Sequence, residues 1–455
     1  MKKVLVAGTG KSGIASAGLL CRNKVDVVLF DENAEIDREK CINGVSESGK
    51  CDGKKIDIIL GSLDDEKIKG IDLAVVSPGI PLESKFVEVL RKNNIPIWSE
   101  IELAYHYAKG HLAACTGTNG KTTTVSLLGE IFKNYTDDAF VVGNIGIPYT
   151  DMADSMDEDS FTAAEISSFQ LETIKDFRPH VSSILNLTPD HLNRHHTFEN
   201  YVQAKARIAE NQTKEDYIVL NYDDPEILKI SGQFENVNIV YFSRKESLED
   251  GVSLWDGEII VKEKAKELAV PIIKVSEIGI PGDHNVENYL AAIAMAFYMG
   301  IPAEVIRNTC LSFKGVEHRI EYVRTLNGVK YYNDSKGTNP DAAIKGIMSM
   351  SGPTCLIGGG YDKGSTFDEW IESFNGKVKA LVLIGKTAEQ IAETAKRHGF
   401  NDIIFADSLE EAVKICYEKA EPGDMVLLSP ACASWDMFKS YEERGELFKK
   451  YVNSL

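Results

Sequence analysis

The chain alternates between short runs of Val, Ile, Leu and Ala and longer amphipathic segments, which predicts strands separated by helices. The apolar runs fall into three groups along the sequence. The groups are Lys3–Ala7, Val25–Phe30, Ile56–Leu60, Ala74–Val76 and Ile95–Trp98; then Leu112–Cys115, Phe140–Val142, Phe161–Glu165, Val181–Leu187 and Tyr217–Leu220; then Val329–Asn333, Thr354–Ile357, Val378–Ile384, Asp402–Phe405 and Met425–Leu428. Nearly continuous apolar strands separated by helices are typical of parallel sheets that helices cover.

The three groups predict an α/β protein with three domains in series. At 455 residues the chain is too long for a single core. We predict a Rossmann-like N-terminal domain over residues 1–98, a central parallel-sheet domain over 99–314, and a Rossmann-like C-terminal domain over 315–455. Alternation around Gly251 and Gly257 predicts hairpins, an antiparallel addition to the central sheet. The longest apolar run, 289–302, is too short to span a bilayer and predicts a core helix.

Composition and charge narrow the class of protein. The chain is 43% hydrophobic and 26% charged, as globular proteins usually are. A net charge of −19 argues against nucleic acid as a partner, because counterion release needs a basic face. The eight cysteines include no Cys-x-x-Cys pair, which favours reduced, buried thiols. The apolar run after Met1 is too short for a signal peptide, so we expect a cytoplasmic enzyme with no membrane partner.

The run ACTGTNGKTTT, residues 114–124, carries the strongest chemical signal. Gly117 and Gly120 allow a tight turn between a strand and a helix, with backbone N–H groups pointing inward. Lys121 adds a cation, and Thr122 offers a hydroxyl to a magnesium ion. Cys115 stands where the usual P-loop has its first glycine, so the loop is a variant. The run predicts a cradle for the β- and γ-phosphates of a nucleotide; the alternative is a junction rich in Gly and Thr by chance.

A second glycine turn lies near the N-terminus. Gly8, Gly10 and Gly13 follow the first strand and Asp31 ends the second, as in a dinucleotide-binding fingerprint. No hydride-transfer set follows, so a substrate with a nucleotide diphosphate is favoured over NAD or a purely structural turn.

Three further groups fall in the central segment. Glu165 ends a strand of the sheet that carries the phosphate loop, the usual place for a magnesium ligand. Asp190 and His191, in the run 186–195, follow another strand and are expected at the same rim. Lys205 lies on a helix with one apolar face. The alternatives are a solvated carboxylate, a structural histidine and a surface lysine.

The chain resembles the Mur ligase family, the amide-forming enzymes that build the peptide of bacterial cell-wall precursors. Beside the loop TGTNGKT (116–122), the resemblance rests on SPGIP (77–81), GDHNVEN (282–288), EHRIE (317–321), NDSKGTNP (333–340), GGGYDKG (358–364) and SPACASWDMFKSYEERG (429–445). These runs span all three predicted domains in the family's order. Gly337 replaces an expected alanine, and Trp435 replaces a smaller apolar residue.

The resemblance implies ATP-dependent addition of D-glutamate to UDP-N-acetylmuramoyl-L-alanine through an acyl phosphate. It implies ATP, two magnesium ions and a CO2-derived carbamate on Lys205, with Lys121, Glu165, His191 and Lys205 as catalytic residues. The implied phosphate ligands are Thr116, Gly117, Thr118, Asn119, Gly120, Lys121, Thr122 and Thr123; the metal ligands are Thr122, Glu165, His191 and Lys205; the base and ribose contacts are Asn285, His318, Arg319 and Asp334.

The resemblance also implies where the two other substrates bind. The UDP-sugar residues are Gly10, Lys11, Ser12, Asp31, Ser77, Gly79 and Asn144, and the D-glutamate residues are Lys336, Thr338, Lys363, Ser434 and Tyr441. We expect a monomer. The alternatives are another ligase of the superfamily, such as a folate polyglutamate synthetase; a P-loop kinase or motor ATPase; and an NAD oxidoreductase.

Overall fold

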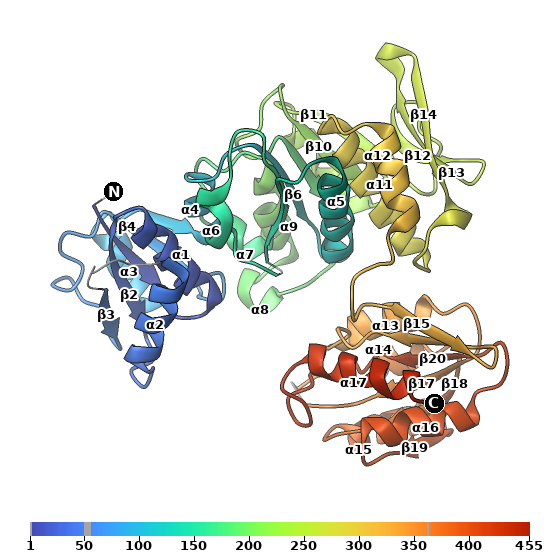
Figure 1. Cartoon of the computed structure of the whole chain (residues 1–455). Coiled ribbons are helices and arrows are strands. Elements are labelled where there is room, and N and C mark those ends of the chain that lie inside the picture. Colours follow the sequence, from blue (N-terminus) through green and yellow to red (C-terminus); the bar gives the residue numbers. More distant parts are fainter. Residues whose placement is uncertain (1, 50–55, 145, 362–363) are drawn as a thin grey trace. The chain divides into compact units, whose positions relative to one another are not determined.

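The computed structural model describes residues 2–49, 56–144, 146–361 and 364–455. They form two compact units, one made of residues 1–276 with 287–310 and the other of 277–286 with 311–455. Three sheets are distributed over these units, two in the first and one in the second (Figure 1). The predicted α/β class with parallel sheets is confirmed, whereas the limits of the three domains stay a prediction.

The first sheet is fully parallel, with the strand order β3-β2-β1-β4-β5. Its elements are β1 (Lys3–Ala7), α1 (Lys11–Arg22), β2 (Asp26–Asp31), α2 (Arg38–Gly49), β3 (Asp57–Leu60), β4 (Leu73–Val76), α3 (Lys85–Lys92) and β5 (Ile97–Ser99). Alternate residues of β1 belong to two cores: Val4 packs with residues of α1 and α2, and Leu5 with residues of α3. The order reverses between β1 and β4, where sheets of this kind bind ligands.

The second sheet has nine strands in the order β14-β13-β12-β11-β10-β9-β6-β8-β7. Its strands are β6 (His111–Thr116), β7 (Ala139–Gly143), β8 (Phe161–Glu165), β9 (Val181–Ile184), β10 (Tyr217–Asn221), β11 (Asn238–Ser243), β12 (Gly251–Trp255), β13 (Glu258–Glu263) and β14 (Leu268–Lys274). The helices of this part are α4 (Glu100–Tyr105), α5 (Lys121–Tyr135), α6 (Tyr149–Met152), α7 (Ser168–Leu171), α8 (Leu192–His195), α9 (Phe198–Ala206), α10 (Pro225–Ile230), α11 (Asp283–Tyr298) and α12 (Ala303–Ser312).

The predicted hairpins of the central sheet are confirmed. β13 pairs antiparallel with β12 and β14, while β6 to β12 pair in parallel. Asp256 and Gly257 turn between β12 and β13 with φ of 48° and 77°, the left-handed geometry of a two-residue hairpin turn.

One predicted strand is too long. The predicted strand 181–187 is rich in Val, Ile and Leu, but β9 ends at Ile184. Leu185 and Leu187 are buried beside the phosphate loop, and the Leu185 N–H donates to the Thr116 carbonyl. Burial under a loop therefore produced the same pattern as a strand.

The third sheet lies in the second unit, with the order β15-β16-β20-β17-β18-β19. Its elements are β15 (Glu321–Leu326), β16 (Val329–Asn333), α13 (Pro340–Met348), β17 (Thr354–Gly358), α14 (Asp368–Glu372), β18 (Val378–Leu383), α15 (Ala388–Arg397), β19 (Ile403–Phe405), α16 (Leu409–Lys419), β20 (Met425–Leu428) and α17 (Tyr441–Asn453). Only the edge strand β15 runs antiparallel. Neither β15 nor β11 was among the predicted strands.

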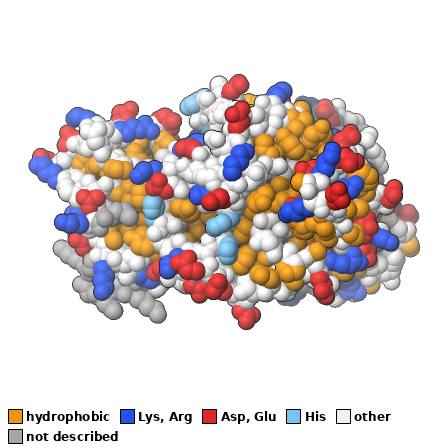
Figure 2. Space-filling view, turned by 90° about the horizontal axis from the view of Figure 1, so that it is seen from above, with side chains coloured by type: hydrophobic (Ala, Val, Ile, Leu, Met, Phe, Trp, Pro, Cys, Tyr) orange, Lys and Arg blue, Asp and Glu red, His pale blue; other side chains and the backbone are white. Residues whose placement is uncertain are grey.

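The surface carries both signs of charge. Figure 2 shows Lys and Arg side chains interspersed with Asp and Glu side chains on the face it draws. Among the described residues, each helix falls short of the length and hydrophobicity that a membrane span requires.

Candidate functional site

The phosphate loop lies at the end of β6, inside the second sheet, and leads directly into α5. Gly117 and Gly120 have φ of 148° and 84°, conformations that side chains rarely adopt. A Cβ on Gly120 would overlap the Asn288 side chain, and one on Gly117 would lie 3.0 Å from Leu185. Asn119 and Asn186 exchange hydrogen bonds of 2.8 and 3.1 Å across the turn. The loop therefore needs its glycines for backbone conformation and for space.

Two of the four predicted magnesium ligands, Thr122 and Glu165, are hydrogen-bonded to each other beside this loop. Thr122 donates its hydroxyl to Glu165 at 3.0 Å, and Asn144 donates its amide to the other carboxylate oxygen at 2.9 Å. Thr122 and Glu165 are buried, and Lys121 donates to the carbonyls of Gly117 and Thr118. A hydroxyl and a buried carboxylate are oxygen ligands of the kind that Mg²⁺ prefers, so these residues fit a magnesium ion at the phosphates.

Lys205 is buried, with 2% of its surface exposed. Its Nζ donates to the Gly117 carbonyl at 2.8 Å and lies 4.8 Å from the centre of the Tyr201 ring. Burial lowers its pKa well below the usual value, and the nearby charge of Lys121 lowers it further. The expected burial of one helix face is confirmed by Tyr201 and Ala204. The surroundings of Lys205 thus favour a neutral amine.

His191 lies at the rim of a cavity. It has a φ of 52°, is exposed, and contacts Asp190 and the Phe169 ring. The cavity has a volume of about 330 Å³ and is lined by Gly79, Pro81, Glu83, Phe169, His191, Asn193, Arg194 and His196. Two predicted site residues from distant segments, Gly79 and His191, therefore line one cavity. Arg194 ties the same segments together by donating to the Pro78 carbonyl at 3.0 Å.

The N-terminal glycine turn is joined to Asp31, at the end of β2, by hydrogen bonds from Thr9. Asp31 accepts hydrogen bonds from the backbone and hydroxyl of Thr9 at 3.1 and 2.8 Å. A Cβ on Gly8 would lie 2.6 Å from the Ser77 hydroxyl, which is buried without a hydrogen-bond partner. Gly10 precedes α1 and has open space around it, and Lys11 and Ser12 begin the helix. The turn, Asp31 and Ser77 thus meet at one point of the first sheet.

Three of the four predicted nucleotide residues of the second unit, Asn285, His318 and Asp334, are buried, and Arg319 is half-buried. His318 and Asp334 are buried, and Asp334 accepts from the Ser429 hydroxyl at 2.7 Å and from the Ile320 N–H at 3.3 Å. Arg319 lies between two residues with positive φ, His318 at 62° and Ile320 at 47°. Asn285 donates to the Pro281 carbonyl in the same unit.

Of the described D-glutamate candidates, Lys336, Thr338 and Ser434 lie on two loops of this unit, and Tyr441 begins α17. Lys336 lies 5.7 Å from the centre of the Tyr441 ring, and Thr338 follows two residues later. Ser434 is buried on the second loop. Lys363 lies outside the described residues. Arg444 joins the loops: it is fully buried and donates to the carbonyls of Ser335 and Cys432.

Asp334 makes stability depend on pH. Burial raises the pKa of its carboxyl from 3.8 to about 7, against the opposing effect of the Ser429 hydrogen bond. A folded-state pKa above the unfolded value means that the folded protein binds the proton more tightly, so this contribution is complete below pH 3.8 and is lost as pH rises towards 7. The free energy of unfolding of Asp334→Asn should fall less between pH 5.5 and 8, roughly, than that of the wild type, as urea titrations would show. Equal pH slopes would contradict this assignment.

Gly337 is the position where an alanine was expected. A Cβ there would lie 2.6 Å from the Asp334 carboxylate and 3.0 Å from the Ser429 hydroxyl. Gly337 therefore leaves room for the Asp334 carboxylate, which the side chain of an alanine would approach too closely.

Several residues of the site were not predicted for it. Tyr201 belongs to the apolar face of the helix that carries Lys205, and its hydroxyl hydrogen-bonds the Thr118 hydroxyl at 2.9 Å. Its spacing of four residues from Lys205 on one helix was the available signal. His195 is buried against the Ser168 hydroxyl at 2.9 Å, and burial lowers its pKa to about 4. Its neighbours give it a structural role.

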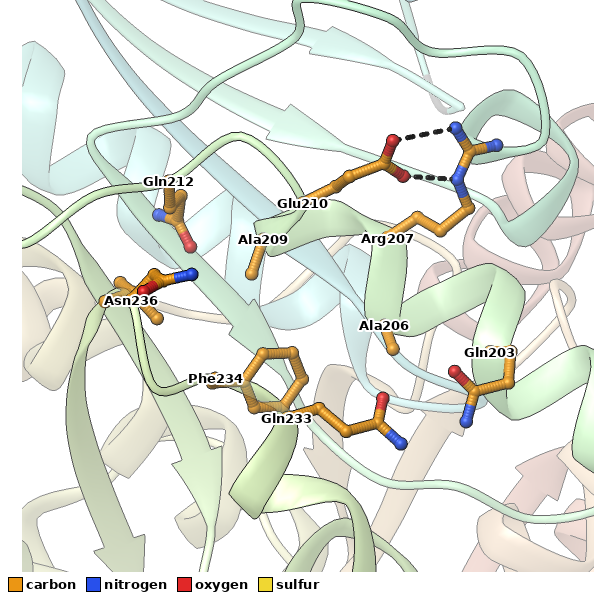
Figure 3. Close-up of a pocket in the computed structure, with 10 residues that line it drawn as sticks. Gln203, Ala206, Arg207, Ala209, Glu210, Gln212, Gln233, Phe234 and Asn236 are labelled. Atoms are coloured by element: carbon orange, nitrogen blue, oxygen red, sulfur yellow. Dashed lines mark hydrogen bonds and ion pairs between the residues drawn. The ribbon is translucent and has the colours of Figure 1, made fainter.

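Figure 3 shows a second cavity, of about 220 Å³, between the end of α9 and the segment before β11. Arg207 and Glu210 pair at its edge, 2.5 Å apart. Gln212, its buried amide, accepts from Ser182 and donates to the Pro179 and Tyr217 carbonyls. The oxygen and both N–H groups of the Gln212 amide thus have hydrogen-bond partners within the protein.

Family models match three stretches of the chain. Residues 2–99 match the Mur ligase MurD-like N-terminal domain, 115–296 the Mur ligase middle domain, and 318–432 the Mur ligase glutamate ligase domain.

Similar proteins of known name cover the whole chain. UDP-N-acetylmuramoylalanine--D-glutamate ligases from Lachnoclostridium phytofermentans, Thermoanaerobacter sp. and Clostridioides difficile are 53%, 52% and 48% identical, over 100% of this chain and 98%, 98% and 99% of theirs. Among solved structures, UDP-N-acetylmuramate-alanine ligase MurC from Thermotoga maritima aligns with a TM-score of 0.60 at 19% identity, over 100% of this chain and 99% of that one. MurF ligase from the same organism, in complex with ADP, aligns with a TM-score of 0.59 at 17% identity, over 94% and 95%. These two structures show likeness of fold.

Proposed function

The chain belongs to the Mur ligase family, and from this premise we propose how its residues join D-glutamate to UDP-N-acetylmuramoyl-L-alanine at the expense of ATP. Identity of 53% to a D-glutamate ligase over the full chain carries the choice of reaction. The reaction uses ATP and Mg²⁺ and forms an amide bond in peptidoglycan precursor synthesis. The expectation that the protein acts as a monomer in the cytoplasm stays a prediction.

The phosphate loop serves the first half of the reaction. A carboxylate oxygen of the UDP-linked substrate attacks the γ-phosphorus of ATP, the bond to ADP breaks, and an acyl phosphate forms. Lys121 and the loop N–H groups hold the phosphates, since two anions must approach each other. Thr122 and Glu165 would hold one magnesium ion, which would neutralise phosphate charge.

We assign a carbamate to Lys205. A neutral amine is needed to attack CO2, and burial beside Lys121 lowers the pKa of Lys205 in the required direction. The nitrogen–carbon bond forms, a proton leaves the nitrogen, and the side chain gains a negative charge. That charge suits a second magnesium ion, for which His191 is the other proposed ligand.

The second half of the reaction uses the second unit. The amine of D-glutamate attacks the carbonyl carbon of the acyl phosphate, loses a proton, and expels phosphate. Lys336, Thr338, Ser434 and Tyr441, together with Lys363, are the proposed D-glutamate ligands; Asn285, His318, Arg319 and Asp334 are the proposed nucleotide ligands. Gly10, Lys11, Ser12, Asp31, Ser77, Gly79 and Asn144 are proposed for the UDP-sugar. Asn144 also donates a hydrogen bond to Glu165, so Asn144 has a second proposed role in orienting that carboxylate.

Phosphate release should depend on both substrates at once. We expect ATP to be converted to ADP and phosphate only when UDP-N-acetylmuramoyl-L-alanine and D-glutamate are present together. L-Glutamate should be at least about 100-fold poorer, as stereochemical selection by two bound carboxylates requires. A coupled phosphate assay measures this. Release that is indifferent to D-glutamate would indicate an ATPase or kinase and would reject the ligase assignment.

A further inference from the structure

Asn333 is a buried amide that holds three segments of the second unit together. It is the last residue of β16 and has no exposed surface. Its amide nitrogen lies 3.0 Å from His318 Nδ1, 3.0 Å from Glu321 Oε2 and 3.4 Å from the Gly445 carbonyl. Its oxygen accepts the Ser335 N–H at 3.2 Å.

These neighbours determine which way the amide points. Glu321 Oε2 and the Gly445 carbonyl can only accept hydrogen bonds, and the Ser335 N–H can only donate. Rotating the amide by half a turn would place its oxygen against two acceptors and its NH2 against a donor. The nitrogen of Asn333 therefore faces His318. Its two hydrogens point to the two acceptors at 3.0 Å, Glu321 Oε2 and His318 Nδ1, and the Gly445 carbonyl at 3.4 Å is a weaker contact, so the ring nitrogen accepts.

The state of the imidazole follows from that orientation. A ring nitrogen that accepts a hydrogen bond carries no hydrogen, so Nδ1 of His318 is the bare nitrogen and Nε2 carries the proton. Glu321 Oε2 lies 3.8 Å from Nδ1, too far for a hydrogen bond, and already accepts from the His318 backbone N–H at 2.9 Å. Nδ1 thus has Asn333 as its partner.

Neighbouring residues also restrict the position of the His318 ring on its other sides. His318 has a φ of 62° and is 5% exposed, a strained backbone that the surrounding contacts maintain. A Cβ on Gly445, in α17, would overlap the ring, so the helix packs directly against it. Nε2 lies 3.6 Å from Glu446, beyond hydrogen-bond distance, and Lys449 pairs with the neighbouring carboxylates Glu317, Glu321 and Glu446.

We propose that Asn333 is a positioning residue that holds His318 in the Nε2–H tautomer, so that the ring offers the nucleotide a hydrogen-bond donor. The group of ATP that meets it must then be an acceptor, such as an unprotonated ring nitrogen of the base or a ribose oxygen. That the nucleotide is ATP rests on the proposed function; the tautomer rests on the contacts alone.

Nitrogen NMR of the full-length protein tests the tautomer directly. With ¹⁵N-labelled histidine, the His318 ring is identified by the signals that vanish in His318→Gln. We expect Nε2 to resonate as a protonated nitrogen and Nδ1 as an unprotonated one, and the Nε2–H signal to move when a non-hydrolysable ATP analogue is added. A protonated Nδ1 in the wild type would overturn the proposal, whatever the activity.

Asn333→Asp supplies the second measurement. A carboxylate facing His318 accepts a hydrogen bond, so Nδ1 should become protonated, and KM for ATP should rise about tenfold, as for one lost hydrogen bond. KM for D-glutamate should change less, because the retained oxygen still accepts from Ser335. The matched control is Asn327→Asp in the exposed β15–β16 turn.

An unchanged tautomer with an unchanged KM for ATP in Asn333→Asp would overturn the proposal. Absent ligase activity with the expected tautomer would reject only the proposed function.

Discussion

Lys205→Ala should lower kcat about 1000-fold while the protein stays folded, because a charge that acts in the transition state is lost. The loss should be specific to catalysis. Lys205 in its amine form contributes hydrogen bonds to Gly117 and Thr116. Lys121 donates to the same Gly117 carbonyl, so in Lys205→Ala this carbonyl keeps one of its two lysine contacts. Steady-state kinetics and thermal melting of the same preparation separate the two effects.

Carboxylic acids should restore part of the activity of Lys205→Ala. The truncated side chain leaves space next to Thr116 and Gly117, and a small carboxylate such as acetate supplies the charge that the carbamate carries. Rescue should saturate with acetate concentration and should be absent in Lys229→Ala, which removes an exposed lysine that pairs with Glu226. Full activity of Lys205→Ala without any additive would remove the carbamate from the mechanism.

The phosphate loop could be predicted from the sequence because its requirements are local. Gly117 and Gly120 have the positive φ that the turn needs, and Lys121 begins the helix that follows. Glu165 could be placed for a related reason: it ends β8, which pairs directly with β6, and the carboxyl ends of parallel strands share one edge.

Contacts between distant segments could not be predicted in the same way. Asn333 and His318 are 15 residues apart, and neither shows in its local pattern that an amide fixes the ring. The meeting of Gly79 and His191 at one cavity depends on packing between two sheets, which periodicity does not describe. Leu185 shows the opposite error, since its burial under a loop resembled the end of a strand.

Glu165→Gln should have the second large effect, again about 1000-fold in kcat, because it replaces the charged oxygen at the phosphates by a neutral amide. Gln has nearly the same size as Glu. In the wild type, Thr122 and Asn144 donate to Glu165 at 3.0 and 2.9 Å, and the single oxygen of Gln can still accept from one of them. The other donor would then face an NH2 group, so a modest loss of stability is expected, of about 1–3 kcal/mol.

Magnesium dependence distinguishes this loss from a general defect. If Glu165 holds the ion, raising Mg²⁺ should recover part of the activity of Glu165→Gln and shift the half-saturating Mg²⁺ concentration upward. Glu226→Gln, which changes a surface carboxylate paired with Lys229, should leave that concentration unchanged. The Glu165 carboxylate contacts both Thr122 and Asn144. Thr122→Val should therefore raise the half-saturating Mg²⁺ concentration as well. Asn144→Asp should leave the enzyme dependent on Mg²⁺. An unchanged Mg²⁺ requirement in Glu165→Gln would assign Glu165 to orienting the loop and would place the ion on other residues.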